Sequence, residues 1–426
     1  MDQSKNHDLR GRESGSEKFF TTPLIIIFVT IFIDLIGFGM VIPILPFYAS
    51  SETFRATPFE IGLLFSVYSW MQFIFSPILG RLSDRYGRRP ILFISLLGSA
   101  LGYFVIGFAT TLALVFIGRI IGGATGGNIS TAQAYIADVT SKENRAKGMG
   151  LFGAAFGMGF ILGPALAGIL SKYGVHVPFY FAAILSFVNA IALYFILPES
   201  LKPGMRPEHE GRKGNIAEIF ESLREPRFRT ITVIYVLLIT AFSIMTYAFV
   251  LFTDFTFGYG AEQNGYLFAY VGFLAIIMQG GLFGVAAKIF GEARLAAFGC
   301  IMLVFSLFAM PFSSPEFGGL AGLLFVSALL AVGNAFASPA LTSLASKYAG
   351  DHEQGKVMGV MQSGASLARA IGPTIGGVLL NNSLNKVDRF TVFRTYWVAS
   401  AIMFVAFLAA VYLMRMLRER ETIGVG

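Results

Sequence analysis

Residues 80–90 read Gly-Arg-Leu-Ser-Asp-Arg-Tyr-Gly-Arg-Arg-Pro. This short charged segment stands between two apolar runs, at about 59–79 and 90–109. Each run has the roughly 20 apolar residues that a helix needs to cross about 30 Å of hydrocarbon. The segment is therefore expected to form a turn between two membrane-spanning helices, at one surface of the bilayer.

The rest of the chain has the composition of a membrane protein. Of its 426 residues, 55% are hydrophobic and only 13% are charged, and the mean hydropathy is +0.68. A water-soluble chain of this size cannot bury so much apolar surface. Apolar runs lie at about 24–49, 59–79, 90–109, 111–137, 148–170, 178–197, 230–253, 265–287, 295–311, 319–343, 357–380 and 395–414. We therefore expect an all-α polytopic membrane protein with twelve transmembrane helices.

The basic residues are distributed unevenly between the two sides of the membrane. The two tails and the even-numbered connections carry 25 of the 32 Lys and Arg residues, and the other side carries 5. Cytoplasmic connections are enriched in Lys and Arg. Both termini are thus expected in the cytoplasm, with the protein in the cell membrane, or in the inner membrane if the chain is bacterial. The formal net charge of +7 then reflects topology, and no nucleic-acid partner is expected.

A faint internal repeat divides the chain into two halves. Adding 209 to Gly163-Pro164 and to Gly168 gives Gly372-Pro373 and Gly377. Such an offset indicates a duplicated unit, so we expect two pseudo-symmetric six-helix bundles. The expected parts are a cytoplasmic tail at 1–22, an N-terminal bundle at 23–197, a cytoplasmic linker at 198–228, a C-terminal bundle at 229–414 and a cytoplasmic tail at 415–426.

Several classes of chemistry are excluded. A single cysteine, Cys300, and four histidines in polar segments allow neither a disulfide framework nor a thiolate metal cluster. Residues 350–356 have the GxxxxGK spacing of a phosphate-binding loop, but Val357 replaces the required Ser or Thr and no strand precedes them. No metal, cofactor or enzymatic activity is expected, and energy for any transport must come from an ion or substrate gradient.

Three motifs carry a resemblance to a known family. Residues 80–90 resemble the cytoplasmic loop motif of the major facilitator superfamily, whose members have two six-helix halves. Residues 34–46, Asp-Leu-Ile-Gly-Phe-Gly-Met-Val-Ile-Pro-Ile-Leu-Pro, resemble the first-helix signature of its drug:proton antiporters, and residues 153–168 resemble their fifth-helix motif. The resemblance covers nearly the whole chain and is closest to the tetracycline-efflux branch, including Tyr-Ile-Ala-Asp at 135–138.

The resemblance implies a secondary active transporter that exports amphipathic small molecules in exchange for protons, by alternating access. It implies a cytoplasmic gate at Gly80, Asp84, Arg85, Gly87, Arg88 and Arg89. It also implies a helix-five interface at Gly153, Gly157, Gly163, Pro164 and Gly168. The alternatives are a basic turn that only sets topology, and glycines that only allow close helix packing.

Three ionisable side chains lie deep within the apolar runs: Asp34, Arg119 and Arg369. An unpaired charge at such depth costs at least a few kcal/mol, so each is a functional candidate. Asp34 lies roughly 16 Å from the start of its helix, near the midplane. We expect Asp34 to be the proton-coupling carboxylate together with Arg119, which lies in a stretch that resembles the family's fourth-helix motif. A structural ion pair between the two is the alternative.

At Arg369 the chain departs from the tetracycline exporters that it resembles, which have a small polar residue at the matching place before the Gly-Pro. The Arg369 guanidinium could bind an anionic or zwitterionic substrate, or pair with Asp34 across the centre of the protein. Further candidates for substrate binding are Gln72, Asn128 and Asn334. Because Ala275 stands where tetracycline exporters have a histidine, tetracycline itself is not the expected substrate.

The expected partners are a small-molecule substrate, protons and membrane lipids, and the protein is expected to act as a monomer. An alternative function is uniport or symport of an anionic metabolite or a lipid-like substrate. A more remote alternative is a receptor or scaffold that transports nothing.

Overall fold

The computed structural model describes residues 21–141, 144–201, 224–348 and 354–423, and nearly all of them are helical. The first half contains α1 (Thr22–Ser50), α2 (Pro58–Tyr86), α3 (Arg88–Gly107), α4 (Leu112–Thr125), α5 (Asn128–Val139), α6 (Arg145–Ser171) and α7 (Val177–Ile196). The second half contains α9 (Pro226–Phe257), α10 (Ala261–Ile277), a π-helical turn (Met278–Leu282), α11 (Phe283–Phe290), α12 (Glu292–Ala309), a 3-10 turn (Met310–Phe312), α13 (Gly319–Tyr348), α14 (Gln354–Leu380) and α15 (Arg389–Ile423).

The expectation of an all-α polytopic membrane protein is confirmed. Within the described residues, 11 helical segments are long and apolar enough to cross a membrane. α14 has the length for a twelfth, at 27 residues. Its composition is more polar, because Gln362, Ser363, Ser366 and Arg369 all lie on it.

Two of the predicted continuous helices are interrupted. The run at 111–137 is divided into α4 and α5 at Gly126 and Gly127. A Cβ atom on Gly126 would lie 2.5 Å from the Tyr68 hydroxyl, and one on Gly127 would lie 2.8 Å from Cα of Ser76. At the break, α2 therefore lies so close to the backbone of Gly126 and Gly127 that neither position has room for a side chain. The run at 265–287 is likewise divided into α10 and α11 by the π-helical turn.

The predicted turn at 80–90 is much shorter than expected. α2 continues to Tyr86 and α3 begins at Arg88, so the chain reverses direction at Gly87 alone. Gly87 has a φ of 106°, which residues with a side chain rarely adopt. The expected tail at 1–22 and linker at 198–228 lie mostly outside the described residues, whereas the expected tail at 415–426 continues α15 as far as Ile423.

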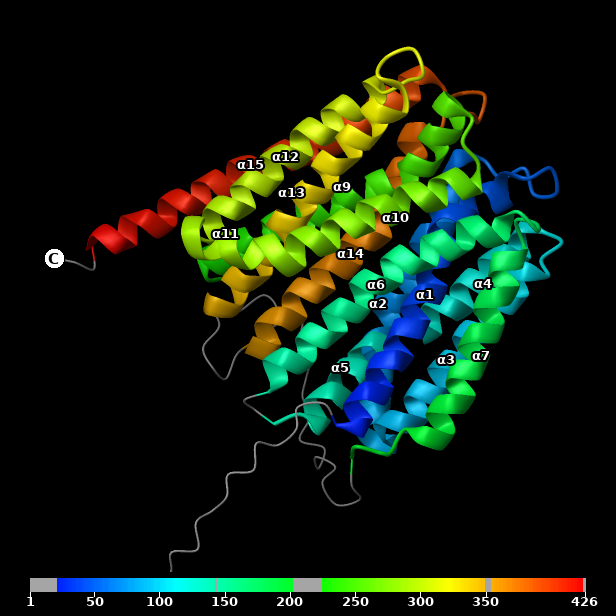
Figure 1. Ribbon diagram of the computed structural model, residues 1–426, viewed down its shortest axis with the longest axis horizontal. Helices are drawn as coiled ribbons and strands as arrows, with labels where there is room; N and C mark the ends of the chain where they lie inside the picture. Colours follow the sequence, from blue (N-terminus) through cyan, green and yellow to red (C-terminus); the bar gives the residue numbers. More distant parts are fainter. Residues whose placement is uncertain (1–20, 142–143, 202–223, 349–353, 424–426) are drawn as a thin grey trace, which may run out of the picture.

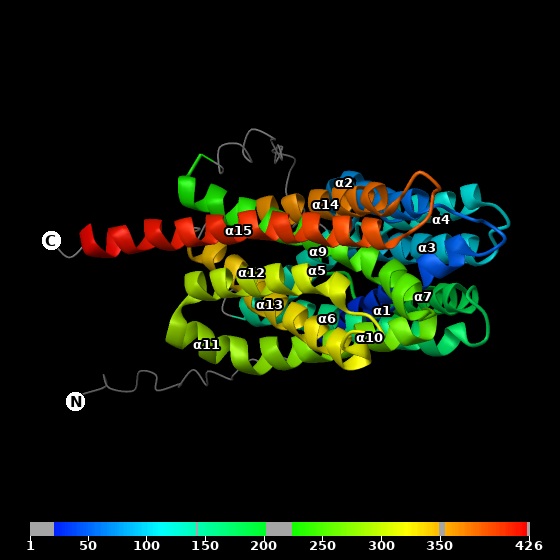
Figure 2. The same cartoon turned by 90° about the horizontal axis from the view of Figure 1, so that it is seen from above.

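The two halves form two helix bundles that meet along two pairs of helices (Figures 1 and 2). Within the first half, α1 packs on α6 and α3 on α7, and within the second half α12 packs on α13 and α9 on α15. Between the halves, the main contacts are those of α2 with α14 and of α6 with α10. We call the side of the bundles on which α1 begins the termini side, and the side on which α1 ends the opposite side.

The contacts between the halves are duplicated on the opposite side. A Cβ atom on Gly265 of α10 would lie 2.5 Å from the Pro164 carbonyl oxygen and 2.9 Å from Cα of Gly168. A Cβ atom on Gly62 of α2 would lie 2.5 Å from the Pro373 carbonyl oxygen and 3.1 Å from Cα of Gly377. The Gly-Pro repeat found in the sequence therefore forms two equivalent close helix crossings, one for each half.

Polar contacts accompany these crossings. The Thr374 hydroxyl donates a hydrogen bond of 2.7 Å to the Ser66 hydroxyl, and the Tyr247 hydroxyl donates one to the Pro58 carbonyl oxygen. The Lys172 ammonium lies 2.8 Å from the Glu262 carboxylate. The opposite side is thus closed by both backbone packing and side-chain bonds.

The paired helices α6 and α10 separate toward the termini side. A Cβ atom on Gly272 would lie 2.5 Å from the side chain of Ile161, and one on Gly157 would lie 3.7 Å from the side chain of Ile276. A Cβ atom on Gly153, one turn nearer the start of α6, would meet nothing within 4 Å among the described residues. The same is true of Gly280 in the π-helical turn that follows α10. The protein is therefore open on the termini side and closed on the opposite side.

Candidate functional site

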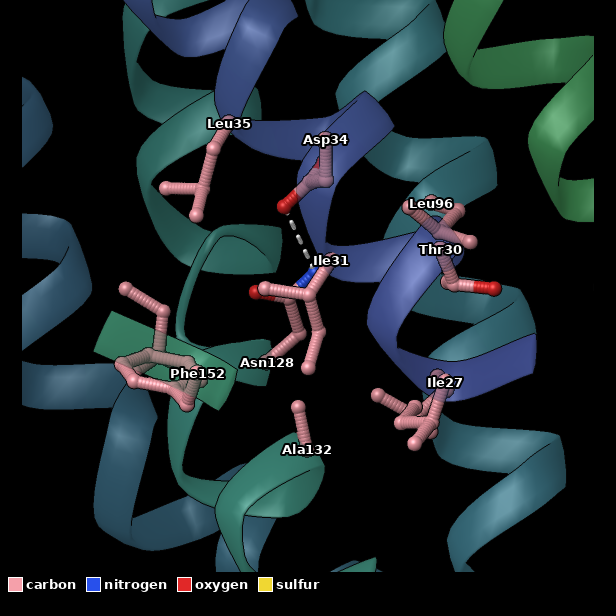
Figure 3. A pocket seen from close by; sticks show the side chains of 11 residues that line it. Ile27, Thr30, Ile31, Asp34, Leu35, Leu96, Asn128, Ala132 and Phe152 are labelled. Atoms are coloured by element: carbon pink, nitrogen blue, oxygen red, sulfur yellow. Dashed lines mark hydrogen bonds between the residues drawn. The ribbon is translucent and has the colours of Figure 1, made fainter. Parts of the chain in front are cut away.

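Asp34 lies in the middle of α1 and has one hydrogen-bond partner among the described residues. The side-chain amide of Asn128 donates a hydrogen bond of 3.2 Å to its carboxylate (Figure 3). Asn128 is the first residue of α5, directly after the helix break, and is 5% exposed. The interruption at Gly126 and Gly127 thus presents this amide to the carboxylate.

Arg119 is bound by α2 rather than by a carboxylate. Its Nε donates a hydrogen bond of 3.0 Å to the Leu64 carbonyl oxygen. Its guanidinium carbon lies 4.3 Å from the centre of the Tyr68 ring and 5.8 Å from that of Phe65. Within the described part of the chain, Arg119 forms no ion pair with Asp34, so the structural ion pair that was the alternative is not formed in this conformation.

The four predicted substrate-binding residues are divided between the halves. Arg369 on α14 donates a hydrogen bond of 3.1 Å to the hydroxyl of Ser366, and no carboxylate of the described residues pairs with it. Gln72 donates a hydrogen bond of 2.9 Å to the carbonyl oxygen of Gly126, so its amide ties α2 to the helix break. Asn128 is bound to Asp34, whereas Asn334 on α13 lies in the second half with Arg369.

The charged residues around Gly87 are bound within the first half. Arg88 lies 2.6 Å from the carboxylate of Asp84 and 3.1 Å from that of Asp138. The Glu199 carboxylate accepts hydrogen bonds of 2.9 and 3.1 Å from the backbone N–H groups of Arg88 and Arg89. This arrangement satisfies the N-terminal backbone donors of α3 and places an anion at the positive end of that helix.

The other predicted gate residues contact aromatic rings. The guanidinium carbon of Arg85 lies 5.2 Å from the centre of the Tyr86 ring, and that of Arg89 lies 4.9 Å from the Tyr194 ring. Gly80 faces the hydroxyl of Ser130, 3.8 Å from a Cβ atom added to it. None of these described contacts crosses to the second half, as expected for a side that is open.

The predicted helix-five interface lies on α6, the fifth membrane-spanning segment, and packs against two other helices. On one face, a Cβ atom on Gly163 would lie 2.8 Å from Cα of Gly39, so this glycine allows α6 to approach α1. On the other, Pro164 and Gly168 form the crossing with α10, whereas Gly153 and Gly157 face the region where the two helices separate.

Sequence reasoning did not select three residues that the structure adds to this region. Tyr68 stacks on Arg119, and Asp138 and Glu199 bind Arg88. Two features of the sequence could have pointed to the carboxylates: Asp138 ends the Tyr-Ile-Ala-Asp stretch, and Glu199 follows Pro198 at the end of an apolar run. No pattern in the sequence pointed to Tyr68, because aromatic residues are common throughout the chain.

Two helix bundles that are closed on one side, open on the other and charged near the centre are the architecture of an alternating-access transporter. Comparison with known proteins then identifies the family. Residues 27–373 and 281–424 match the Major Facilitator Superfamily, and the chain belongs to that family.

Curated relatives include drug-resistance proteins. The tetracycline resistance protein, class H, of Pasteurella multocida is 33% identical over 397 residues, which cover 91% of this chain and 95% of that protein. Multidrug resistance protein 2 of Bacillus subtilis (strain 168) is 29% identical over 85% of this chain and 90% of its own length. The resemblance to the drug:proton antiporters and to the tetracycline-efflux branch is therefore confirmed.

Solved structures share the fold at lower identity. The human organic anion transporter MFSD10 (TETRAN) superposes with a TM-score of 0.68 at 24% identity, over 91% of this chain and 99% of that one. A bacterial homolog of the human lysosomal transporter Spinster, in an inward-facing and occupied conformation, superposes with a TM-score of 0.75 at 12% identity, over 92% and 96% of the two chains.

Proposed function

We propose that this transporter exports amphipathic small molecules in exchange for protons, by rocking of its two halves around a central site. The curated relatives are named for resistance to tetracycline and to multiple drugs, which supports export of such molecules. We further propose that it works as a monomer in contact with membrane lipids and carries out no enzymatic chemistry.

The termini side is assigned to the cytoplasm, in the cell membrane or, for a bacterial protein, the inner membrane. This assignment rests on the excess of Lys and Arg in the tails and even-numbered connections. The separation of α6 and α10 on that side then corresponds to an inward-open conformation. An exporter in this state receives its substrate from the cytoplasm.

Asp34 is the residue we assign to proton coupling, and its surroundings carry the proposal. It is a carboxylate in the middle of a membrane-spanning helix, and its one partner among the described residues is a neutral amide. Taking up a proton removes the cost of keeping an unpaired charge at this depth. Arg119, fixed on the Tyr68 ring, supplies a positive charge to the same bundle and is assigned to proton coupling with Asp34.

The test compares Asp34→Asn with the wild type in proteoliposomes. We expect the variant to lose uphill export driven by a pH gradient, because an amide cannot exchange a proton, and to retain counterflow of substrate. Asp388→Asn, which changes an aspartate outside the membrane-spanning segments, is the matched control and should behave as the wild type. Uphill export by Asp34→Asn at the wild-type rate would disprove the assignment.

Arg369 is the residue we assign to substrate selection, with Gln72 and Asn334 as further polar candidates; Asn128, the remaining predicted residue, is bound to Asp34 and lines a space inside the first bundle. A guanidinium bound only to a neutral hydroxyl of the described residues attracts a negative group on a substrate. Matched anionic and cationic ligands distinguish this role from a general structural one. Loss of the anion alone in Arg369→Ala supports selection, whereas equal losses of both ligands contradict it. Uniport or symport of an anionic metabolite is not favoured, given the efflux relatives.

The residues around Gly87 are assigned to a cytoplasmic gate, and the glycines of α6 to the moving interface. In the inward-open state Asp84 is paired with Arg88 of its own half. Closure of this side would bring the second half within reach of these charges, so that partners can be exchanged. Asp84→Asn should then slow transport and favour the inward-open state. Unchanged transport rates and labelling would indicate a topological role only.

A further inference from the structure

The carboxylate of Asp34 borders a small cavity inside the first bundle (Figure 3). Residues of α1, α3, α5 and α6 line this cavity, and all of them belong to the first half. Arg369, by contrast, lies on α14 of the second half. Asp34 therefore borders a space that is lined by the first half alone.

The cavity extends from Asp34 toward the termini side. Along α1 it reaches Ile27, seven residues earlier, which is roughly 10 Å at 1.5 Å per residue. On the other helices, Leu92 lies four residues from the termini-side end of α3, whereas Ala132 on α5 and Phe152 on α6 each lie seven residues from the termini-side ends of their helices. The lining residues thus lie between the carboxylate and the termini-side surface.

The size of the cavity and its three polar lining residues, Thr30, Asp34 and Asn128, suit one water molecule. Its volume is about 20 Å³, and a buried water needs about 10–15 Å³ on the same scale. The side-chain amide of Asn128 donates to Asp34, and its carbonyl oxygen has no hydrogen-bond partner within the described ranges. Since an amide both donates and accepts, Asn128 can bind either the carboxylate or, after turning its oxygen inward, the protonated acid.

The ionisable groups near Asp34 are held by other contacts. Tyr68 of α2 and Tyr103 of α3 are its titratable neighbours, and both tyrosines also interact with Arg119 of α4. Tyr68 is covered by the Arg119 guanidinium, and Tyr103 packs against Gly37 of α1, 3.3 Å from a Cβ atom added there.

We propose that Asp34 exchanges its proton with the termini side through this cavity inside the first bundle, along a route separate from the path of the substrate. Asn128 acts as the positioning residue that holds the carboxylate at the inner end of the route. The carboxylic acid of Asp34 gives its proton to water in the cavity, and from there the proton passes to bulk water. Asp34 then remains as a carboxylate. The inference rests on the proposed role of Asp34. A separate route lets proton release and substrate binding proceed at the same time in the inward-open state.

The experiment measures proton release after a rapid rise in pH, with a pH-indicator dye and the purified full-length protein. The difference between wild type and Asp34→Asn isolates the proton of Asp34. Ala132→Leu fills the cavity one helical turn from Asn128, and we expect it to slow this component at least about tenfold, a barrier about 1.4 kcal/mol higher. Ala134→Leu, the same change on the same helix away from the cavity, should release the proton at the wild-type rate.

Equal rates in Ala132→Leu, Ala134→Leu and the wild type would overturn the proposed route and leave the role of Asp34 intact. If Asp34→Asn removes no component from the signal, the proposed proton-coupling role itself is wrong. Thermal unfolding shows whether Ala132→Leu is folded. If it is not, the smaller Ala132→Val decides by the same comparison, with slower release supporting the route and an unchanged rate overturning it.

Discussion

The close crossing of α6 and α10 makes a quantitative prediction about which side of the transporter is open. Gly265→Ala places a Cβ atom 2.5 Å from the Pro164 carbonyl oxygen and 2.9 Å from Cα of Gly168. Both neighbours are backbone atoms, so neither can rotate away, and the two helices must separate by roughly 1 Å to restore ordinary contact. The closed form of the opposite side is therefore destabilised.

The magnitude follows from the cost of overpacking. An extra methyl group in a well-packed interface costs about 1–3 kcal/mol, which changes a two-state ratio by about 5-fold to 150-fold in favour of the form open on the opposite side. Alanine also favours the helix over glycine by up to about 1 kcal/mol. That gain is the same in both forms, because α10 stays helical, and so it does not affect the ratio.

The assay is thiol labelling from the opposite side. The single native cysteine, Cys300, is fully buried, so a cysteine introduced at Ser66 provides the signal. Ser66 is 1% exposed and is bonded to Thr374 under the second crossing. We expect a membrane-impermeant maleimide to label Ser66→Cys about 5 to 150 times faster when Gly265→Ala is added, because the labelling rate follows the population of the form open on the opposite side.

Gly150→Ala is the matched control, because it is the same change on a helix where an added Cβ atom meets nothing within 4 Å. It should leave the labelling of Ser66→Cys unchanged. Equal labelling rates with Gly265→Ala and with Gly150→Ala would refute the view that the glycine crossing closes the opposite side.

Two further predictions concern side-chain contacts. Tyr68→Leu removes the ring under the Arg119 guanidinium, worth about 2 kcal/mol in a desolvated site, and should lower the unfolding temperature; Tyr68→Phe keeps the ring and should not. A similar loss in both variants would assign the effect to the hydroxyl. Lys172→Glu or Glu262→Lys breaks the ion pair between the halves and should speed labelling of Ser66→Cys, while the double exchange restores it. If the double variant labels as fast as either single variant, the pair does not stabilise the closed form.

Much of the fold follows from local properties of the chain. A membrane-spanning helix needs only length and apolar composition, so the spans could be found from the runs of residues that form them. Duplication leaves the same residues at a fixed offset, which is why the Gly-Pro at 163–164 and at 372–373 predicted two related bundles. Asp34, Arg119 and Arg369 stood out because charge is costly anywhere within such runs.

Partners across the fold could not be read in the same way. Arg119 was a candidate partner for Asp34, but the tertiary structure binds it to Tyr68 and Leu64 of α2, and gives Asp34 an amide from a broken helix. The break itself depends on how closely α2 approaches Gly126 and Gly127. Glycine in a sequence permits such an approach without saying which helix makes it.

The sequence by itself determined the transmembrane helices, the twofold repeat and the rare charges within the apolar runs, because each depends on residues close together in the chain or on a fixed spacing. Only the tertiary structure decided which helices meet, which side is open and where the space beside Asp34 leads. The physical reason is that these features are set by distances between helices. A separation that grows from direct contact at Gly168 to more than 4 Å at Gly153 leaves no trace in the order of the residues.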